Sequence, residues 1–169
     1  MKRSKQQILS SSVALVTGGT KGIGAATAIA LAKAGAEVAI VGRKLSTEAK
    51  ETRRQIEKLG RKCFLILADV AEPVQAARCV KETAKKLGPV DVLVHSAGGP
   101  VNGGLFELAP ETWRAAFDVH VHAIFHLCRA AVPAMQQKKR GAIILISSAA
   151  GVRGIKTNIA YQVVKGALP

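Results

Sequence analysis

The chain has 169 residues, of which 49% are hydrophobic and 21% charged, with a formal net charge of +14. This length suits one domain with a sizeable core, and the composition excludes an intrinsically disordered chain. Charged residues interrupt the apolar stretches well before the ~18 residues that a membrane-spanning helix needs. We therefore expect a single domain over residues 1–169, with no membrane segment.

The positive charge raises the question of nucleic-acid binding, because clustered Lys and Arg neutralise phosphates. The basic residues are spread over the separate stretches 50–62, 81–86 and 138–140, and only 4% of residues are aromatic and able to stack on bases. We assign most of this charge to solvated helix faces and expect no nucleic-acid partner. A basic scaffold or nucleic-acid binder is the third of three hypotheses, and it requires salt-sensitive retention of DNA or RNA.

The three cysteines are Cys63, Cys79 and Cys128. They are far apart in the sequence and odd in number, and no two of them form a Cys-x-x-Cys pair. They therefore indicate neither a disulfide framework nor a zinc knuckle. We therefore expect a reducing compartment and a cytoplasmic location.

Five short runs rich in β-branched and apolar residues predict buried strands. Each run is continuous rather than alternating, which is typical of a parallel sheet covered by helices on both faces. The runs span residues 13–16, 38–41, 63–67, 90–94 and 142–146.

Helix-like segments with recognisable ends lie between these runs. Ser46 is a candidate N-cap, and Pro73 suits the first turn of a helix. Glycines predict the helix ends: Gly35 after segment 24–34, Gly60 after the second helix and Gly88 after the third.

A longer helical segment starts near Pro110 and ends before Gly141, and Pro133 predicts a kink or break within it. Strands that alternate with helices imply right-handed crossovers and a doubly wound sheet, whose ligands lie outside the carboxyl ends of the strands. The last helix has barely begun at Pro169, which leaves the fifth strand at an open edge. The expected fold is an α/β, Rossmann-type parallel sheet with helices on both faces and its C-terminal strands missing, hence a fragment.

A glycine-rich turn follows the first strand and opens the first helix, the context that a phosphate-binding turn requires. Glycines allow positive φ and close approach to a pyrophosphate, and the helix N-terminus attracts an anion. The spacing G-x-x-x-G-x-G differs from the generic G-x-G-x-x-G fingerprint, and a tight surface turn without a ligand is the alternative. The candidate cofactor-binding residues here are Thr17, Gly18, Thr20, Lys21, Gly22, Ile23 and Gly24.

The residues after the second strand indicate which dinucleotide binds. The sequence Val41-Gly42-Arg43-Lys44 has no acidic residue where an NAD site would hydrogen-bond the ribose hydroxyls. Arg43 and Lys21 are cationic, and a guanidinium can pair with a 2′-phosphate, so NADP(H) is favoured over NAD(H). The alternative is that Arg43 is an ordinary surface arginine.

Asp69 ends the third strand, followed by Val70, and both are candidate cofactor contacts. The Asp69 carboxylate at this edge of the sheet can accept a hydrogen bond from the adenine amino group. A helix-capping aspartate would have the same sequence pattern.

Three motifs occur in order along nearly the whole chain: the turn from Thr17 to Gly24, Ser147-Ser148 after the fifth strand, and Tyr161-Gln162-Val163-Val164-Lys165. Together they resemble the short-chain dehydrogenase/reductase family. The resemblance implies an oxidoreductase that interconverts a carbonyl and a secondary alcohol. It implies that Tyr161 gives a proton to the carbonyl oxygen, that Lys165 holds the nicotinamide ribose, and that Ser148 donates a second hydrogen bond.

Tyr161 and Lys165 are i and i+4, so they share one face of the last helix. A phenol needs a cation within ~4–6 Å to give up its proton near neutral pH, and Lys165 is expected to supply it. Out of context the pair would be read as two surface residues of an amphipathic helix.

Two segments depart from the family's pattern. Asn-Asn-Ala-Gly of the family is replaced by His95-Ser96-Ala97-Gly98, in which Ser96, Ala97 and Gly98 remain candidate contacts for the adenosine side. The active-site asparagine of the family is replaced by His120, which either takes over its place in a proton relay or leaves the relay impaired.

His122 and His126 are i and i+4, as two zinc ligands on a helix can be, but no third ligand or catalytic carboxylate is evident nearby. We expect no metal site, and interpret them as helix histidines at a surface or subunit contact.

The first hypothesis is therefore an NADPH-dependent carbonyl reductase or alcohol dehydrogenase. A 3-oxoacyl thioester, a polyol and a small ketone all stay open as substrates. The resemblance implies a dimer or tetramer of identical chains. The second hypothesis, motivated by His120, Ser96 and the early end of the chain, is a dinucleotide-binding module with weak or no catalysis.

Overall fold

The computed structural model describes residues 7–154, 156 and 158–169. In this part of the chain a five-stranded parallel sheet has the strand order β3-β2-β1-β4-β5. This confirms the predicted doubly wound α/β fold. The strands are β1 (Val13–Thr17), β2 (Glu37–Gly42), β3 (Cys63–Leu67), β4 (Val92–His95) and β5 (Ala142–Leu145).

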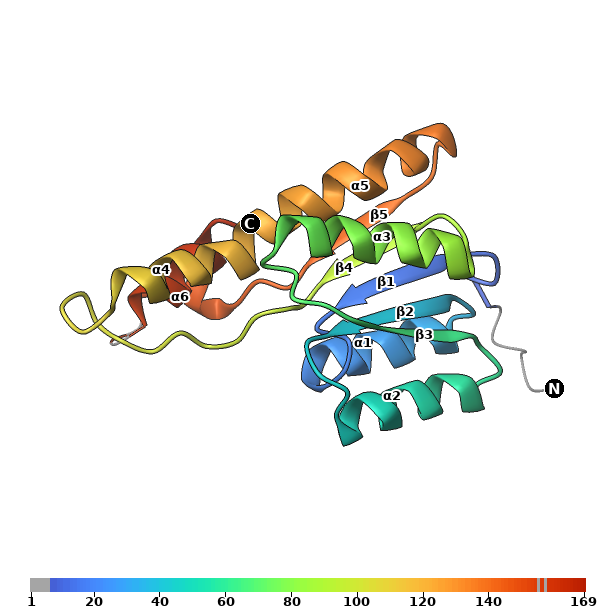
Figure 1. Cartoon of the computed structure of the whole chain (residues 1–169), viewed down its shortest axis with the longest axis horizontal. Helices are drawn as coiled ribbons and strands as arrows, with labels where there is room; N and C mark the ends of the chain where they lie inside the picture. Colours follow the sequence, from blue (N-terminus) through green and yellow to red (C-terminus); the bar gives the residue numbers. More distant parts are fainter. Residues whose placement is uncertain (1–6, 155, 157) are drawn as a thin grey trace.

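Helices cover both faces of the sheet (Figure 1). α1 (Gly22–Lys33) and α2 (Thr47–Lys58) lie on one face, and α3 (Pro73–Leu87) and α5 (Ala123–Gln137) lie on the other. Successive side chains of a strand point to opposite faces, so β1 to β4 each contribute to two cores. In β1, Ala14 and Val16 belong to the core under α1, and Leu15 belongs to the core under α3 and α5. Burial on both faces is the reason that β1, β2 and β4 are continuously apolar. β5 is different, because it lies at the edge of the sheet with Ile143 and Ile144 each 42% exposed, so the prediction of a buried strand is wrong there.

The predicted helix ends are confirmed. The Ser46 hydroxyl accepts a hydrogen bond from the Ala49 amide at 3.2 Å, and Pro73 is the first residue of α3. Gly35, Gly60 and Gly88 all have positive φ, a backbone conformation that glycine adopts without the steric penalty of a side chain.

The long helical segment is interrupted at a different place from the one that the sequence predicted. The sequence predicted a kink or a break at Pro133. α5 continues through Pro133, so the break is wrong, and the kink stays a prediction. A proline removes one backbone donor, and the burial of Leu127, Ala131 and Met135 on either side of it holds the helix together. The interruption lies instead between α4 (Pro110–Phe117) and α5, where Asp118–His122 form a π-helical turn.

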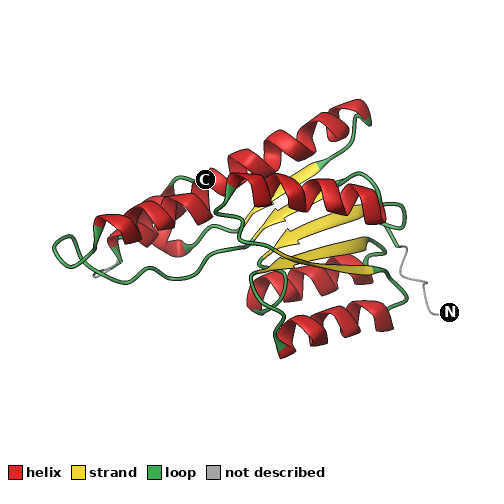
Figure 2. Ribbon diagram, viewed as in Figure 1, coloured by secondary structure: helices red, strands yellow, loops and turns green. Residues whose placement is uncertain are grey.

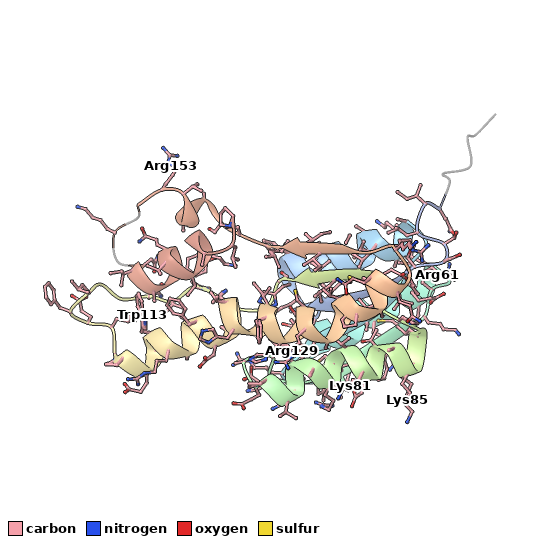
Figure 3. The ribbon with its side chains drawn as sticks, turned by 90° about the horizontal axis from the view of Figure 1, so that it is seen from above. Arg61, Lys81, Lys85, Trp113, Arg129 and Arg153 are labelled. Carbon is pink, nitrogen blue, oxygen red and sulfur yellow. The ribbon has the colours of Figure 1, made fainter. Side chains whose placement is uncertain are left out.

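α4 and α6 (Ile159–Gly166) lie beside the sheet rather than on it (Figure 1). They pack through a small cluster of Ala116, Ala160 and Val164, with Trp113 against it. Figure 3 shows Trp113 on α4, and Arg153 on the segment that leads from the 3-10 turn Ala149–Gly151 to α6. None of the helices in the described ranges is both long and apolar enough to cross a bilayer.

The basic side chains labelled in Figure 3 come from several elements. Lys81 and Lys85 lie on α3, Arg129 lies on the neighbouring α5, and Arg61 lies in the turn before β3. Arg61 pairs with Glu37 at 2.6 Å.

Candidate active site

The predicted site residues lie along the edge of the sheet formed by the carboxyl ends of its five strands. The strand arrows in Figure 2 all point toward the side of the sheet where α4 and α6 lie. Thr17 at the end of β1 is in register with His95 at the end of β4, which in turn is in register with Leu145 of β5. β1 and β4 are neighbours at the point where the strand order reverses, and this crevice is where open α/β sheets bind ligands.

The glycines of the Thr17–Gly24 turn have different physical roles. Gly18 has φ +66°, and a Cβ there would lie 2.7 Å from the Ser96 carbonyl oxygen. A Cβ on Gly24 would lie 2.2 Å from the Gly18 carbonyl oxygen. Gly22 has φ +56°, but a Cβ there would meet nothing within 4 Å. Gly18 and Gly24 are therefore required by close packing, whereas Gly22 faces open space.

The N-terminus of α1 opens onto this space. Its first turn contains no acidic residue, and the N-cap residue Lys21 makes no side-chain capping bond. Ile23 is 65% exposed. Free helix N–H groups beside a cationic side chain suit an anionic group such as a pyrophosphate, so the residues present fit the phosphates of a dinucleotide.

The side chains of Thr20 and Val70 are both buried. Val70 belongs to the hydrophobic core under α3. Thr20 is buried, and its side chain fills the position next to Gly42, where a Cβ would lie 2.6 Å from it. Both side chains are held by packing, and their assignment to a cofactor site stays a prediction.

Arg43 and Asp69 follow β2 and β3 at the same edge of the sheet. Arg43 is exposed, and no carboxylate in the described part of the chain pairs with it. Asp69 Oδ1 accepts a hydrogen bond from the Ala71 amide at 3.0 Å. This contact stabilises the turn before α3 and engages one of the two carboxylate oxygens. Asp69 does not cap the helix, which was the alternative from the sequence, because the N-cap residue of α3 is Glu72.

Tyr161 and Lys165 lie on one face of α6, as predicted from their spacing. Lys165 Nζ is 5.7 Å from the centroid of the Tyr161 ring and donates a hydrogen bond of 2.6 Å to the Ile146 carbonyl. Lys165 is only 6% exposed, and this burial lowers the pKa of its ammonium group.

The two serines after β5 have different partners. Ser148 Oγ accepts from the Ala150 amide at 3.2 Å and caps the 3-10 turn, which leaves its hydroxyl hydrogen for another acceptor. Ser147 Oγ donates to the Lys165 carbonyl at 3.0 Å and so ties α6 to the end of β5. Sequence analysis assigned Ser147 no role, and only its place beside Ser148 pointed to one.

His120 is placed in the π-helical turn with its ring beside Tyr161. The two ring centroids are 5.7 Å apart, and His120 is 1% exposed. Its Nε2 hydrogen-bonds the Gly99 carbonyl at 3.1 Å, and its Nδ1 has no partner among the described residues. Burial, with the nearby positive charge of Lys165, lowers the pKa of His120, so the ring is neutral near pH 7.

His95 is a second buried histidine that the sequence did not assign to the site. Its Nδ1 lies 2.9 Å from Thr17 Oγ1, and its Nε2 lies 3.0 Å from the Val119 carbonyl. Burial lowers the pKa of His95 to about 4. One feature of the sequence could have pointed to His95. Like His120, it is a histidine at a position where the family has an asparagine.

The remaining histidines of this helix are elsewhere. His122 lies 2.9 Å from Asp118 at the surface, and the ring of His126 packs against Phe125. Across the described ranges no group of three His, Cys, Asp or Glu side chains is arranged to hold a metal ion.

Comparison with known proteins matches this architecture. The family model of the short chain dehydrogenases matches residues 12–169. General stress protein 39 of Bacillus subtilis is 36% identical over 161 residues, which cover 95% of this chain and 56% of that protein. A 3-oxoacyl-[acyl-carrier-protein] reductase of Synechocystis is 34% identical over 157 residues, covering 93% of this chain and 64% of that protein.

Among solved structures, the L-sorbose reductase of Gluconobacter frateurii in complex with NADPH and L-sorbose superimposes with a TM-score of 0.91 at 34% identity. The match covers 96% of this chain and 62% of the reductase. The chain thus spans less than two thirds of the length of these three relatives.

Proposed function

This chain belongs to the short chain dehydrogenase family, and we propose that the whole protein interconverts a carbonyl and a secondary alcohol with a nicotinamide dinucleotide. The observation that carries the proposal is the grouping of Tyr161, Lys165 and His120. Lys165 Nζ and the His120 ring each lie 5.7 Å from the centre of the Tyr161 ring. This group stands at the carboxyl ends of β4 and β5, because His120 bonds the Gly99 carbonyl after β4 and Lys165 bonds the Ile146 carbonyl after β5.

For cofactor binding, we assign the pyrophosphate to the backbone of the turn at Gly18, Gly22 and Gly24 and to the N-terminus of α1. The adenosine end is assigned to Asp69 and to the segment Ser96–Gly98. Support comes from the open space at Gly22 and from the uncapped N-terminus of α1. When bound, the dinucleotide would supply or accept the hydride.

We propose that NADP(H) is preferred over NAD(H). β2 ends without an acidic residue, and Arg43 follows it with an exposed side chain. Guanidinium groups pair well with phosphates, and Lys21 adds a second positive charge at the turn. The sorbose reductase was solved with NADPH, which supports the same preference.

In the reduction direction, the Tyr161 hydroxyl donates its proton to the carbonyl oxygen as that oxygen becomes negative. Lys165 stabilises the resulting phenolate. Ser148 donates a second hydrogen bond to the same oxygen, which holds the carbonyl in place and stabilises its developing charge. His120 offers the lone pair of Nδ1 to a proton relay, in the position of the family's asparagine.

The substrate is proposed to be a small molecule with a ketone or secondary alcohol. The 3-oxoacyl-[acyl-carrier-protein] reductase and the L-sorbose reductase are named for a 3-oxoacyl thioester and a keto sugar, and these two classes and simple ketones are the candidates. We further propose one domain over residues 1–169, a homodimer or homotetramer, and a cytoplasmic location. The test is carbonyl-dependent oxidation of NADPH by the whole protein, run over a panel of all three classes.

A second candidate function is a dinucleotide-binding module with weak or no catalysis. It is favoured by one observation: a buried histidine with a lowered pKa, His120, stands where the family has its active-site asparagine. Calorimetric binding of NADPH without turnover on any member of the panel would support this candidate over the enzyme.

A further inference from the structure

Each of the two buried histidines of the site hydrogen-bonds a backbone carbonyl in the segment that carries the other histidine. His95, at the end of β4, reaches the carbonyl of Val119 in the π-helical turn at 3.0 Å. His120, in that turn, reaches the carbonyl of Gly99 in the loop after β4 at 3.1 Å. We call these two hydrogen bonds the histidine clasp. They join segment 95–99 to the turn at 118–122 in both directions.

We propose that His95 is a positioning residue that holds the π-helical turn, and with it His120, against Tyr161. The inference rests on the proposed function for the role of His120 and Tyr161. The clasp itself rests only on the contacts of the two histidines.

The acceptors define the protonation of both rings. A backbone carbonyl can only accept a hydrogen bond, so Nε2 of each histidine must carry a hydrogen. Each Nδ1 of a neutral ring is then an acceptor. Both histidines therefore take the same tautomer, and the clasp needs no ionised group.

The two Nδ1 atoms differ in their partners. Nδ1 of His95 accepts from the Thr17 hydroxyl at 2.9 Å, and the oxygen of that hydroxyl receives the amides of Ser96 and Ala97 at 3.3 Å each. Nδ1 of His120 has no partner among the described residues. His95 is saturated, as a positioning group should be, and His120 keeps one acceptor for the chemistry.

The saturated network of His95 connects both halves of the site. Through Thr17 it reaches the glycine-rich turn, where Gly18 packs against the Ser96 carbonyl. Through Val119 it reaches the residue next to His120. The groups proposed to hold the cofactor and those proposed to move the proton are therefore fixed relative to each other by a single buried ring.

The clasp has little room to relax. Gly98 lies in segment 95–99 and packs directly against the His120 ring. A Cβ on Gly98 would lie 2.1 Å from Cε1 of His120. His95 and His120 are 2% and 1% exposed. Because misplacement by about 1 Å can cost about a hundredfold in rate, a ring held this tightly is suited to set the rate of the proposed reaction.

A buried histidine that only stabilises the fold would make the same hydrogen bonds, so the test must separate positioning from stability. The variants are His95→Phe, which keeps a ring but removes both hydrogen bonds, and His95→Asn, which restores the family's residue. His126→Phe on α5 is the matched control, because His126 packs on Phe125 outside the site.

We expect His95→Phe to lower kcat about tenfold to a hundredfold, with KM and the Kd for NADPH changed less than about threefold. His95→Asn should recover part of kcat, and His126→Phe should match the unmodified protein. In a His120→Ala background, His95→Phe should lower kcat much less than it does alone, because the relay group that it positions is gone. An unchanged kcat in a folded His95→Phe protein, or an equal loss in both backgrounds, would overturn the proposal.

Two measurements do not depend on activity. In the unmodified whole protein labelled with ¹⁵N-histidine, His95 should give the neutral Nε2–H spectrum from pH 7.5 to 5.5, and His120 should give the neutral Nε2–H spectrum at pH 7.5. Amide exchange at residues 118–122 should be at least about tenfold faster in His95→Phe than in the His126→Phe control. Titration of His95 near pH 6.5, or unchanged exchange, would overturn the clasp. If no carbonyl is turned over, the proposed function fails, whereas these two readouts still decide the clasp.

Discussion

The ring of His120 stands edge-on to the ring of Tyr161, with centroids 5.7 Å apart and ring planes at 78°. The two residues are 41 positions apart by their numbers, and they meet because the π-helical turn directs His120 inward toward α6. Single π turns inside α-helices are frequent at functional sites. Here the turn buries an imidazole beside the proposed proton donor.

Replacement of Arg43 by alanine should change cofactor preference. The exposed guanidinium after β2 is our proposed partner for the 2′-phosphate, and a hydrogen bond to a charged group contributes roughly 1.5–3 kcal/mol. We expect the Kd for NADPH to rise about tenfold to a hundredfold and the Kd for NADH to stay unchanged, measured by calorimetry. Lys50→Ala on α2 is the control. Equal weakening of both dinucleotides would show that Arg43 does not read the 2′-phosphate.

Replacement by alanine should be harmful at Gly98 and tolerated at its neighbour Gly99. Gly98 has φ +107°, and its Cβ would strike His120, whereas a Cβ on Gly99 would meet nothing within 4 Å. Strain of this kind costs about 1–3 kcal/mol before the steric clash is added. Gly98→Ala should lower the thermal unfolding midpoint and weaken NADPH binding, and Gly99→Ala should do neither to a comparable extent. Equal tolerance of the two would mean that the His120 ring moves freely.

The buried histidines should make the free energy of unfolding depend on pH. The folded pKa of His95 is about 4 against an ordinary value of 6.5, and the pKa of His120 is also lowered. Between these values the unfolded chain binds more protons than the folded one, so stability is full above about pH 6.5 and falls as the pH drops toward 4. The positive charge of Lys165 contributes to the lowered pKa of both rings and so adds to this loss of stability at low pH.

For His95 alone the loss amounts to about 3 kcal/mol over that interval. Urea unfolding at a series of pH values measures it, and the His95→Asn/His120→Asn double variant provides the comparison. We expect the double variant to lose less stability over the same interval. An identical pH dependence in both proteins would mean that the histidines are not buried as neutral rings.

The sheet and most helix ends could be predicted because their signals are local. The continuous apolar runs of β1, β2 and β4 specify strands with two covered faces, the Ser46 hydroxyl accepts an amide of its own helix, and Gly35 follows the end of α1. The exposed β5 shows that the same pattern does not report whether a neighbouring layer covers the strand. The i, i+4 spacing of Tyr161 and Lys165 likewise placed both on one face of α6.

The features that sequence analysis missed depend on contacts between distant segments. Pro133 is the conspicuous helix breaker, yet α5 passes through it because flanking residues are buried in the core. The π turn has no marker residue in the sequence. The role of His95 arises only when β4 and the turn at 118–122 lie side by side, which no spacing along the chain reveals.

The measurement that tests the account most directly is NADPH oxidation by the whole protein and by its Tyr161→Phe variant, with NADPH binding followed by calorimetry in both. Val163→Ala, at an exposed position of the same helix, is the control. We expect carbonyl-dependent turnover with at least one substrate class, a loss in kcat of at least about a hundredfold in Tyr161→Phe, and unchanged NADPH binding. Turnover that persists in Tyr161→Phe at the rate of the Val163→Ala control would contradict the central claim that Tyr161 is the proton donor.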